Sequence, residues 1–197
     1  MTWDELIRPF EFEFFRNGIY VATIAGALCG LVGCYVVLRN MCYIGHGLSH
    51  SIFGGYAVAG LIGVNLFLGA GIWGVITALA VGGIVRNRPI GSDAAIGVVT
   101  TASFALGLAL VQLYGSPGRN ADALLFGHVL GVTTSDVWLI VAVATATAAI
   151  VFFFYRPVLF TTCDTQVAAA TGVRTAWIDA LLRIVLSATV LAALKVL

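Results

Sequence analysis

Long apolar runs, separated by short polar stretches, organise this chain. Six of them are close to twenty residues long, the length at which an α-helix crosses a lipid bilayer. They cover residues 19–38, 42–66, 70–85, 94–114, 137–155 and 176–197, and the last is interrupted by Asp179 and Arg183. The strands of a β-barrel would instead show alternation over about ten residues. The pattern therefore predicts an all-α integral membrane protein, a polytopic bundle of about six transmembrane helices.

The composition supports this class. Hydrophobic residues make up 60% of the chain and charged residues 10%, whereas a soluble domain has roughly 45–50% and about 25%. So few charges cannot cover a water-exposed surface. The net charge of +1 provides no basic face for nucleic acid. The four cysteines have no paired spacing and are predicted to be small apolar core residues; they are Cys29, Cys34, Cys42 and Cys163.

Arginines in the connecting segments predict the orientation. Those after the first, third and fifth runs are Arg39, Arg86, Arg88, Arg156 and Arg174, and those on the opposite side are Arg8, Arg16 and Arg119. The positive-inside rule assigns the first group to the cytoplasm. Residues 1–18, which mix aromatic and acidic side chains, are then expected to rest at the outer interface. Residues 124–131 are too short to cross, so an interfacial or re-entrant piece is predicted there.

His46 and His50 are the main candidates for chemistry. Because they are four residues apart, a helix would place both imidazoles on one face. Such a pair suits a borderline-soft divalent cation such as Zn²⁺, although two histidines can also simply hydrogen-bond a neighbouring helix. Small residues recur every four positions beside them: Gly47, Ser51, Gly55, Ala59 and Gly63. This stripe favours close helix packing, so the histidines are expected to face the bundle interior.

Two further segments carry candidate functional residues. His128, in the short outer piece, could meet an incoming metal ion or be an ordinary surface residue. Residues 164–172 have the capping pattern of a short helix, with Asp164 at the N-cap and Gly172 after the C-terminus. This helix is either a plain connector or a docking site for a cytoplasmic partner. Asp179 and Arg183 are expected to form a structural pair. No nucleotide-binding loop or nucleophile-base set indicates an enzyme.

Four stretches, in order, resemble the metal-ion ABC importer permeases, the zinc/manganese/iron family. They are residues 39–50, 89–97, 124–136 and 163–172. The resemblance implies a permease that forms a homodimer around a central path in the inner (plasma) membrane of a prokaryote. It also implies a cytoplasmic ABC ATPase subunit, which hydrolyses ATP in place of this chain, and an extracytoplasmic metal-binding protein.

The resemblance also implies roles for individual residues. His46 and His50 would form a transient site for Zn²⁺ or Mn²⁺, carried as substrate, with no tightly bound cofactor. Residues 160–175 would be the cytoplasmic coupling segment. Its expected ATPase-coupling residues are Asp164, Thr165, Gln166, Ala168 and Gly172.

Three departures from the family pattern matter. Many members have aspartate where His46 stands; since imidazole suits Zn²⁺ and carboxylate suits Mn²⁺, the change favours zinc. Thr165 stands where proline is common. The family is longer, so residues 1–197 are expected to be one transmembrane permease domain that lacks the C-terminal spans.

Three alternative functions remain open from the sequence. A permease for a metal chelate, such as a siderophore or cobalamin, would not need paired histidines. An ion-coupled secondary carrier would need no docking helix and would often have inverted repeats, which are not seen. The third alternative is a non-functional remnant of a transporter, which would carry no substrate.

Overall fold

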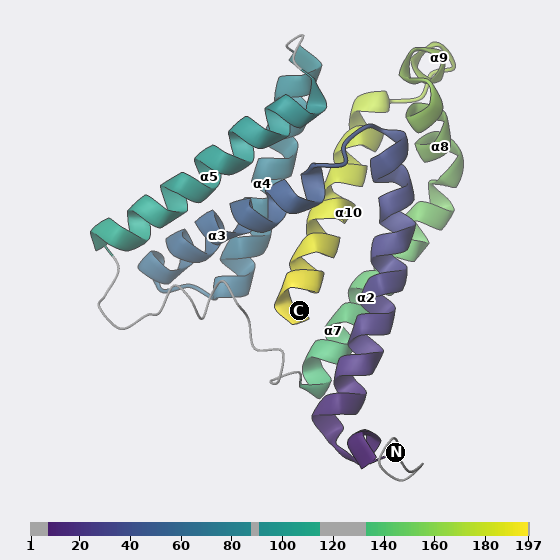
Figure 1. Cartoon of the computed structure of the whole chain (residues 1–197). Helices are drawn as coiled ribbons and strands as arrows, with labels where there is room; N and C mark the ends of the chain where they lie inside the picture. The colour runs from purple at the N-terminus through teal and green to yellow at the C-terminus, as the bar shows by residue number, and fades with distance from the viewer. Residues whose placement is uncertain (1–7, 88–90, 115–132, 197) are drawn as a thin grey trace.

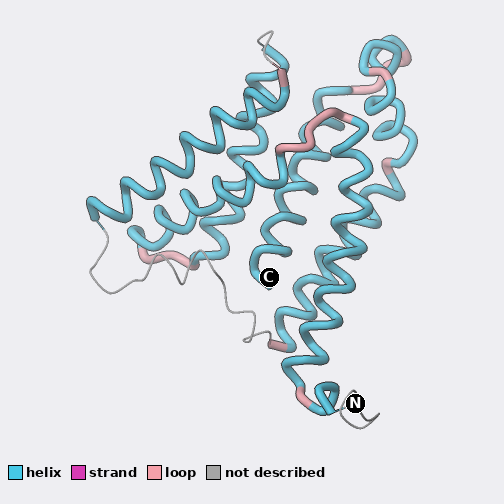
Figure 2. The backbone as a smooth tube through the Cα atoms, viewed as in Figure 1, coloured by secondary structure: helices cyan, strands magenta, loops and turns pink. Residues whose placement is uncertain are grey.

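The computed structural model describes residues 8–87, 91–114 and 133–196, and the elements in these ranges are all helical (Figures 1 and 2). A short 3₁₀ helix, η1, covers Arg8–Glu11. The long helices are α2 (Glu13–Leu38), α3 (Ile44–Ile62), α4 (Leu66–Asn87), α5 (Ser92–Tyr114), α7 (Thr134–Phe153) and α10 (Thr175–Val196). Two short helices, α8 (Tyr155–Cys163) and α9 (Thr165–Ala170), lie between α7 and α10.

The six long helices within the described residues correspond to the six predicted spans, which confirms an all-α polytopic bundle. Five of them are long and apolar enough to cross a membrane: α2, α4, α5, α7 and α10. The sixth, α3, is 19 residues long but carries two histidines and five glycines. The long helix that is not among these five is thus the one that carries the candidate site.

Two predicted boundaries are wrong. The helix of the first span begins at Glu13, six residues before the predicted start at residue 19. The turn between α3 and α4 lies at residues 63–65, not between residues 66 and 70 where the predicted spans meet. Gly63 ends α3 with a left-handed φ of 78°, and the Asn65 side chain accepts hydrogen bonds from the backbone N–H groups of Phe67 and Leu68, at 3.0 and 3.4 Å. Local capping therefore sets this turn.

The predicted burial of the cysteines is also wrong, because all four are exposed in this chain. The reason is visible on α2, which packs against α7 and buries one stripe of side chains. That stripe contains Asn17, Val21, Ala25, Leu28, Val32 and Tyr35. Cys29 and Cys34 lie on other faces of the helix.

The helix ends alternate between two ends of the molecule (Figure 1). The C-terminal ends of α2 and α4 and the N-terminal ends of α5 and α10 lie at the end that carries α9, and η1 lies at the opposite end. Arg39, Arg86 and Arg174 therefore share one end of the bundle, as the loop pattern predicts. The predicted segment at residues 124–131, with His128, and the positions of Arg88 and Arg119 lie outside the described residues.

Helices α3, α4 and α5 pack with almost no space between their backbones. A Cβ atom added at Gly107 of α5 would lie 2.6 Å from the Cα atom of Gly54 on α3. One added at Gly55 would lie 2.8 Å from both Ala70 Cα and Gly69 O on α4. The small-residue stripe of α3 is thus the seam of this three-helix unit, as the sequence predicts.

This packing predicts a large difference between two glycine substitutions. Gly107→Ala is expected to destabilise the protein by about 1–3 kcal/mol, because the added methyl group meets backbone that cannot move aside. Gly30→Ala on α2 is the matched control, since nothing lies within 4 Å of its added Cβ. Thermal unfolding of both variants in detergent measures the effect. Equal unfolding temperatures would contradict the close backbone contact.

Candidate functional site

His46 and His50 lie one turn apart on α3, as predicted. Their ring centroids are 4.6 Å apart and their planes are nearly perpendicular, at 81°. Tyr43 packs against His46 at 5.3 Å, and Phe104 of α5 packs against His50 at 5.4 Å. The four rings form one aromatic row, which we call the histidine row.

The histidine row does not face the interior of this chain. Both histidine side chains are exposed, whereas the neighbouring Gly47, Ser51 and Gly55 are buried. Within a single chain the histidines do not point into the bundle, and their expected position facing a path between two permeases stays a prediction. Gly47, Ser51, Gly55 and Ala59 of the small-residue stripe occupy the buried face of α3, since only residues without large side chains allow α4 and α5 to approach so closely. Gly63, the last residue of the stripe, is exposed beyond the end of the helix. The histidines lie on another face, which is open.

Two imidazoles are too few to enclose a metal ion. Zn²⁺ sites in proteins are usually four-coordinate, with three protein ligands at least. No cluster of three or more histidine, cysteine, aspartate or glutamate side chains occurs in the part of the chain that the structure describes. His128 lies outside that part. An ion held by His46 and His50 would need ligands from beyond the described residues, such as water or a second chain.

A hydrogen-bond relay holds α3 against its neighbours just after His50. The indole Nε1 of Trp73 on α4 donates to Ser103 Oγ on α5 at 2.6 Å. The Ser103 hydroxyl donates in turn to the backbone O of Ser51 at 3.2 Å. An indole N–H can only donate, so the relay has a single direction. Ser103 also precedes Phe104, so one turn of α5 both fixes α3 and packs against His50. The sequence analysis missed this relay.

The predicted short helix at residues 164–172 is present as α9. The Asp164 carboxylate caps it by accepting from the N–H groups of Gln166 and Val167, at 2.8 and 3.0 Å. Gly172 ends it with a φ of 83°. The N–H groups of Gly172 and Val173 bond to the carbonyl groups of Ala169 and Ala168, both at 3.1 Å, which is a Schellman motif. Both predicted caps are confirmed.

The coupling residues predicted in this segment divide into two groups. Asp164, Thr165, Gln166 and Gly172 are exposed, but Ala168 is fully buried. Ala168 therefore holds α9 against the rest of the chain and presents no surface to a partner. We refer to α8, Asp164 and α9 together as the α8–α9 elbow.

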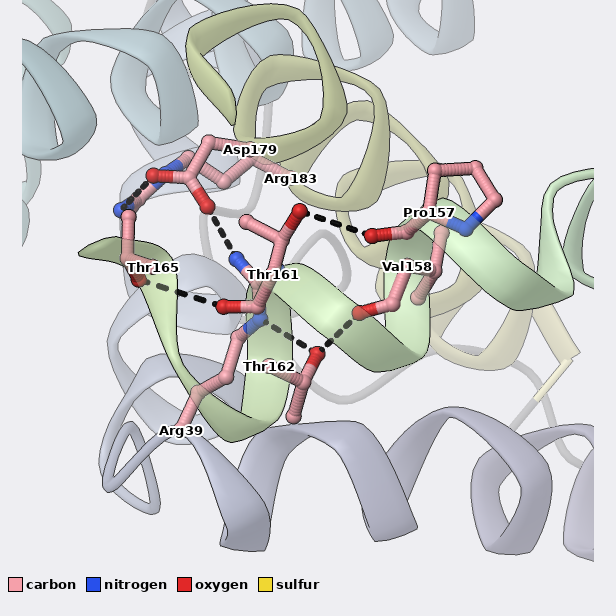
Figure 3. A network of polar contacts seen from close by, with 8 residues as sticks. All are labelled: Arg39, Pro157, Val158, Thr161, Thr162, Thr165, Asp179 and Arg183. Atoms are coloured by element: carbon pink, nitrogen blue, oxygen red, sulfur yellow. Dashed lines mark hydrogen bonds and ion pairs between the residues drawn. The ribbon is translucent and has the colours of Figure 1, made fainter. Parts of the chain in front are cut away.

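Beside the α8–α9 elbow lies a charged network in which two arginine side chains are buried and Asp179 is partly exposed (Figure 3). Arg39, at the end of α2, forms an ion pair with Asp179 of α10, and its Nε donates to Thr162 Oγ1 of α8 at 3.0 Å. Arg183, one turn beyond Asp179, approaches the same carboxylate at 4.0 Å. The predicted pair of Asp179 and Arg183 is thus present, but the sequence analysis missed Arg39, which is the closer partner.

The network holds more positive than negative charge. The side chains of Arg39 and Arg183 are only 9% and 7% exposed, and one carboxylate serves both. Within the described residues, Arg39 Nη2 and Arg183 Nη1 have no hydrogen-bond partner. Unpaired buried donors on charged groups are costly, so the arrangement is held by the surrounding packing.

The helices define a polytopic α-helical membrane protein with a histidine pair on one span. More narrowly, the chain belongs to the ABC 3 transport family, whose family model matches residues 11–197.

The chain is similar to proteins named as manganese transporters. It is 37% identical to the manganese transport system membrane protein MntC of Halalkalibacterium halodurans, over 98% of this chain and 65% of that protein. It is 32% identical to the manganese import system permease protein ScaB of Streptococcus parasanguinis, over 83% of this chain and 58% of that protein. The chain thus spans less than two thirds of the length of these curated relatives.

A solved structure has the same fold. It is titled "PsaBC from Streptococcus pneumoniae in complex with Fab", and it superposes with a TM-score of 0.80 at 28% sequence identity. The match covers 98% of this chain and 70% of that chain.

Proposed function

We propose that this chain is the membrane-spanning permease subunit of an ABC importer that moves a divalent transition metal ion into the cytoplasm. The observation that carries the proposal is the pair of imidazoles at His46 and His50, one turn apart on α3. Ionisable side chains are rare in transmembrane helices and usually mark a transport path. Family membership supplies the class of transporter. ATP hydrolysis belongs to a separate subunit, so this chain is not itself an enzyme.

Zinc is the metal we propose as preferred cargo. The relatives are named for manganese, and an importer of this kind could carry either ion. Neutral imidazole nitrogen is a good ligand for Zn²⁺, whereas Mn²⁺ prefers carboxylate and other oxygen ligands. Neither His46 nor His50 has a carboxylate beside it in the histidine row. The described residues therefore offer only nitrogen ligands at this site.

A second copy of the permease would complete the site. The histidine row is open on the surface of one chain, and two copies facing each other across a central path would bring four imidazoles together. Four nitrogen ligands suffice for a tetrahedral ion. Exchange among fewer ligands at a time would keep binding transient, as import requires, and the metal is substrate, with no tightly bound cofactor.

The remaining partners follow from the same class. Residues 1–197 act as one permease domain, embedded in the lipid bilayer of a prokaryotic plasma membrane, with the α9 end in the cytoplasm. An extracytoplasmic metal-binding protein delivers the ion. The cytoplasmic ATPase docks on the exposed side of the coupling segment at residues 160–175, where Thr165, Gln166 and Ala169 are accessible.

Metal uptake with the ATPase and metal-binding protein tests this function. Cells that lack their own importers and express the three proteins are expected to accumulate ⁶⁵Zn²⁺. Ala169→Trp is expected to lower uptake at least tenfold, because the indole blocks the exposed face of α9. Phe152→Trp, at an exposed position of α7 outside the coupling segment, is the control and should retain uptake.

Two outcomes would contradict the proposal. Import of a metal chelate, without import of free Zn²⁺ or Mn²⁺, would assign the chain to a different substrate class. Native uptake by the Ala169→Trp variant would show that α9 is not the docking helix.

A further inference from the structure

We infer that Arg39 is a positioning residue that transmits movement of the α8–α9 elbow to α3, the helix with the paired histidines. The inference rests on the proposed function and extends it. It names the side chain through which ATPase docking at one end of the molecule reaches the metal site.

Arg39 connects three helices (Figure 3). It is the C-cap residue of α2, its Nε donates to Thr162 of α8 at 3.0 Å, and its Nη1 pairs with Asp179 of α10. The contacts join residues 123 and 140 positions away in sequence. Arg39 therefore links the end of α2 directly to α8 and α10 through polar contacts.

The hydrogen bond between Arg39 and the α8–α9 elbow has a fixed donor and a fixed acceptor. The Thr162 hydroxyl donates to Val158 O at 2.7 Å, so its oxygen is left to accept from Arg39. Thr165, the first residue of α9, donates to Thr161 O at 3.2 Å. Helix α9 is thus tied back to the turn of α8 that holds Arg39. A displacement of α9 by a docked partner would act on the guanidinium group through this turn.

The segment between Arg39 and the histidines is short, and its backbone conformation is fixed by hydrogen bonds. Helix α2 ends in a Schellman motif, in which the N–H of Asn40 bonds to Val37 O and that of Met41 to Val36 O, both at 3.0 Å. Asn40 adopts the left-handed φ of 52° that this motif requires. Met41 is then buried at 2% exposure, and α3 begins at the fully buried Ile44, two residues before His46.

The charge arrangement allows the Arg39 contact to open. Asp179 has a second cation in reach, since Arg183 lies 4.0 Å away on the same helix. If Arg39 moved with the elbow, the carboxylate would keep a partner. Arg39 Nη2 and Arg183 Nη1 are unpaired among the residues that the structure describes. Two guanidinium groups therefore share one carboxylate, so loss of the Arg39 contact leaves Asp179 with one cation in reach.

The test compares Zn²⁺ import with ATP hydrolysis in proteoliposomes that contain the permease, its ATPase and the metal-binding protein. Thr162→Val and Arg39→Met are each expected to lower the number of ions imported per ATP by about fivefold or more, the range of typical coupling between sites. ATP hydrolysis is expected to continue. Thr162→Ser keeps the hydroxyl and should retain the native ratio.

Thr145→Val is the matched control. Thr145 makes the same intrahelical bond, to Val141 O at 2.8 Å, but it is exposed on α7. An unchanged ratio in both Thr162→Val and Arg39→Met would overturn the inference, as would equal losses of import and hydrolysis, which indicate a general structural defect. Absence of metal transport by the unmodified protein would instead contradict the proposed function, and the inference with it.

Discussion

His50→Ala is expected to lower uptake of both Zn²⁺ and Mn²⁺ by at least roughly a hundredfold. Loss of residues that merely orient a metal ligand already costs 10–100-fold, and His50 would be a ligand itself. Its loss leaves one imidazole per chain in the histidine row, because His46 is the only other histidine there. The measurement is competitive uptake of the two ions with the metal-binding protein and ATPase present.

His46→Asp is the companion variant and is expected to change selectivity instead of abolishing uptake. A carboxylate oxygen at this position pairs a hard ligand with the His50 imidazole, which suits Mn²⁺ better than two nitrogens do. The ratio of Mn²⁺ to Zn²⁺ uptake should therefore rise. Ser49→Ala is the control on the same helix, since its hydroxyl only bonds back to His46 O at 2.7 Å. Native Zn²⁺ uptake by His50→Ala would identify the histidines as packing residues.

The spans could be predicted from the sequence because charge and apolar length are local properties. So could α9, whose two caps depend on single residues, Asp164 and Gly172. The boundary errors came from competing local signals. Gly69 and Gly71 look like a turn, yet they lie inside α4, where Gly69 allows α3 to approach closely and Gly71 faces Leu191 of α10. Glycine marks either a turn or a packing seam, and only tertiary contacts separate the two.

The candidate site could be predicted only in part for the same reason. A spacing of four places His46 and His50 on one face of a helix, but it does not say which face is buried. Burial is decided by α4 and α5, which pack on the small-residue stripe of α3. The Arg39–Asp179 pair was missed because its residues are 140 positions apart and share no local pattern. A charged residue next to an apolar run is usually interpreted as the end of a span.

Asp179→Asn is expected to lower the free energy of unfolding by about 1–2 kcal/mol, less than the loss of one partner of a fully buried ion pair, because the Asp179 side chain is 36% exposed and water screens part of its interaction. The carboxylate is the negative charge that faces both Arg39 and Arg183. Both guanidinium groups are buried. Asparagine keeps the size of the side chain but leaves two cations without a counter-charge at the junction of α2, α8 and α10. Thermal unfolding in detergent, read from the loss of monodisperse protein on heating, measures the change.

Arg183→Met provides the contrast, and it is expected to leave stability close to that of the unmodified protein. It removes the excess cation and keeps the closer pair of Arg39 and Asp179, so the network becomes neutral. The Arg183 side chain packs against α4, where a Cβ atom added at Gly82 would come within 2.8 Å of Arg183 Nε. A flexible, unbranched side chain such as methionine can occupy that space. If Asp179→Asn unfolds at the native temperature while Arg183→Met is strongly destabilised, the stabilising interaction belongs to Arg183 and α4, and Asp179 does not compensate the buried charges.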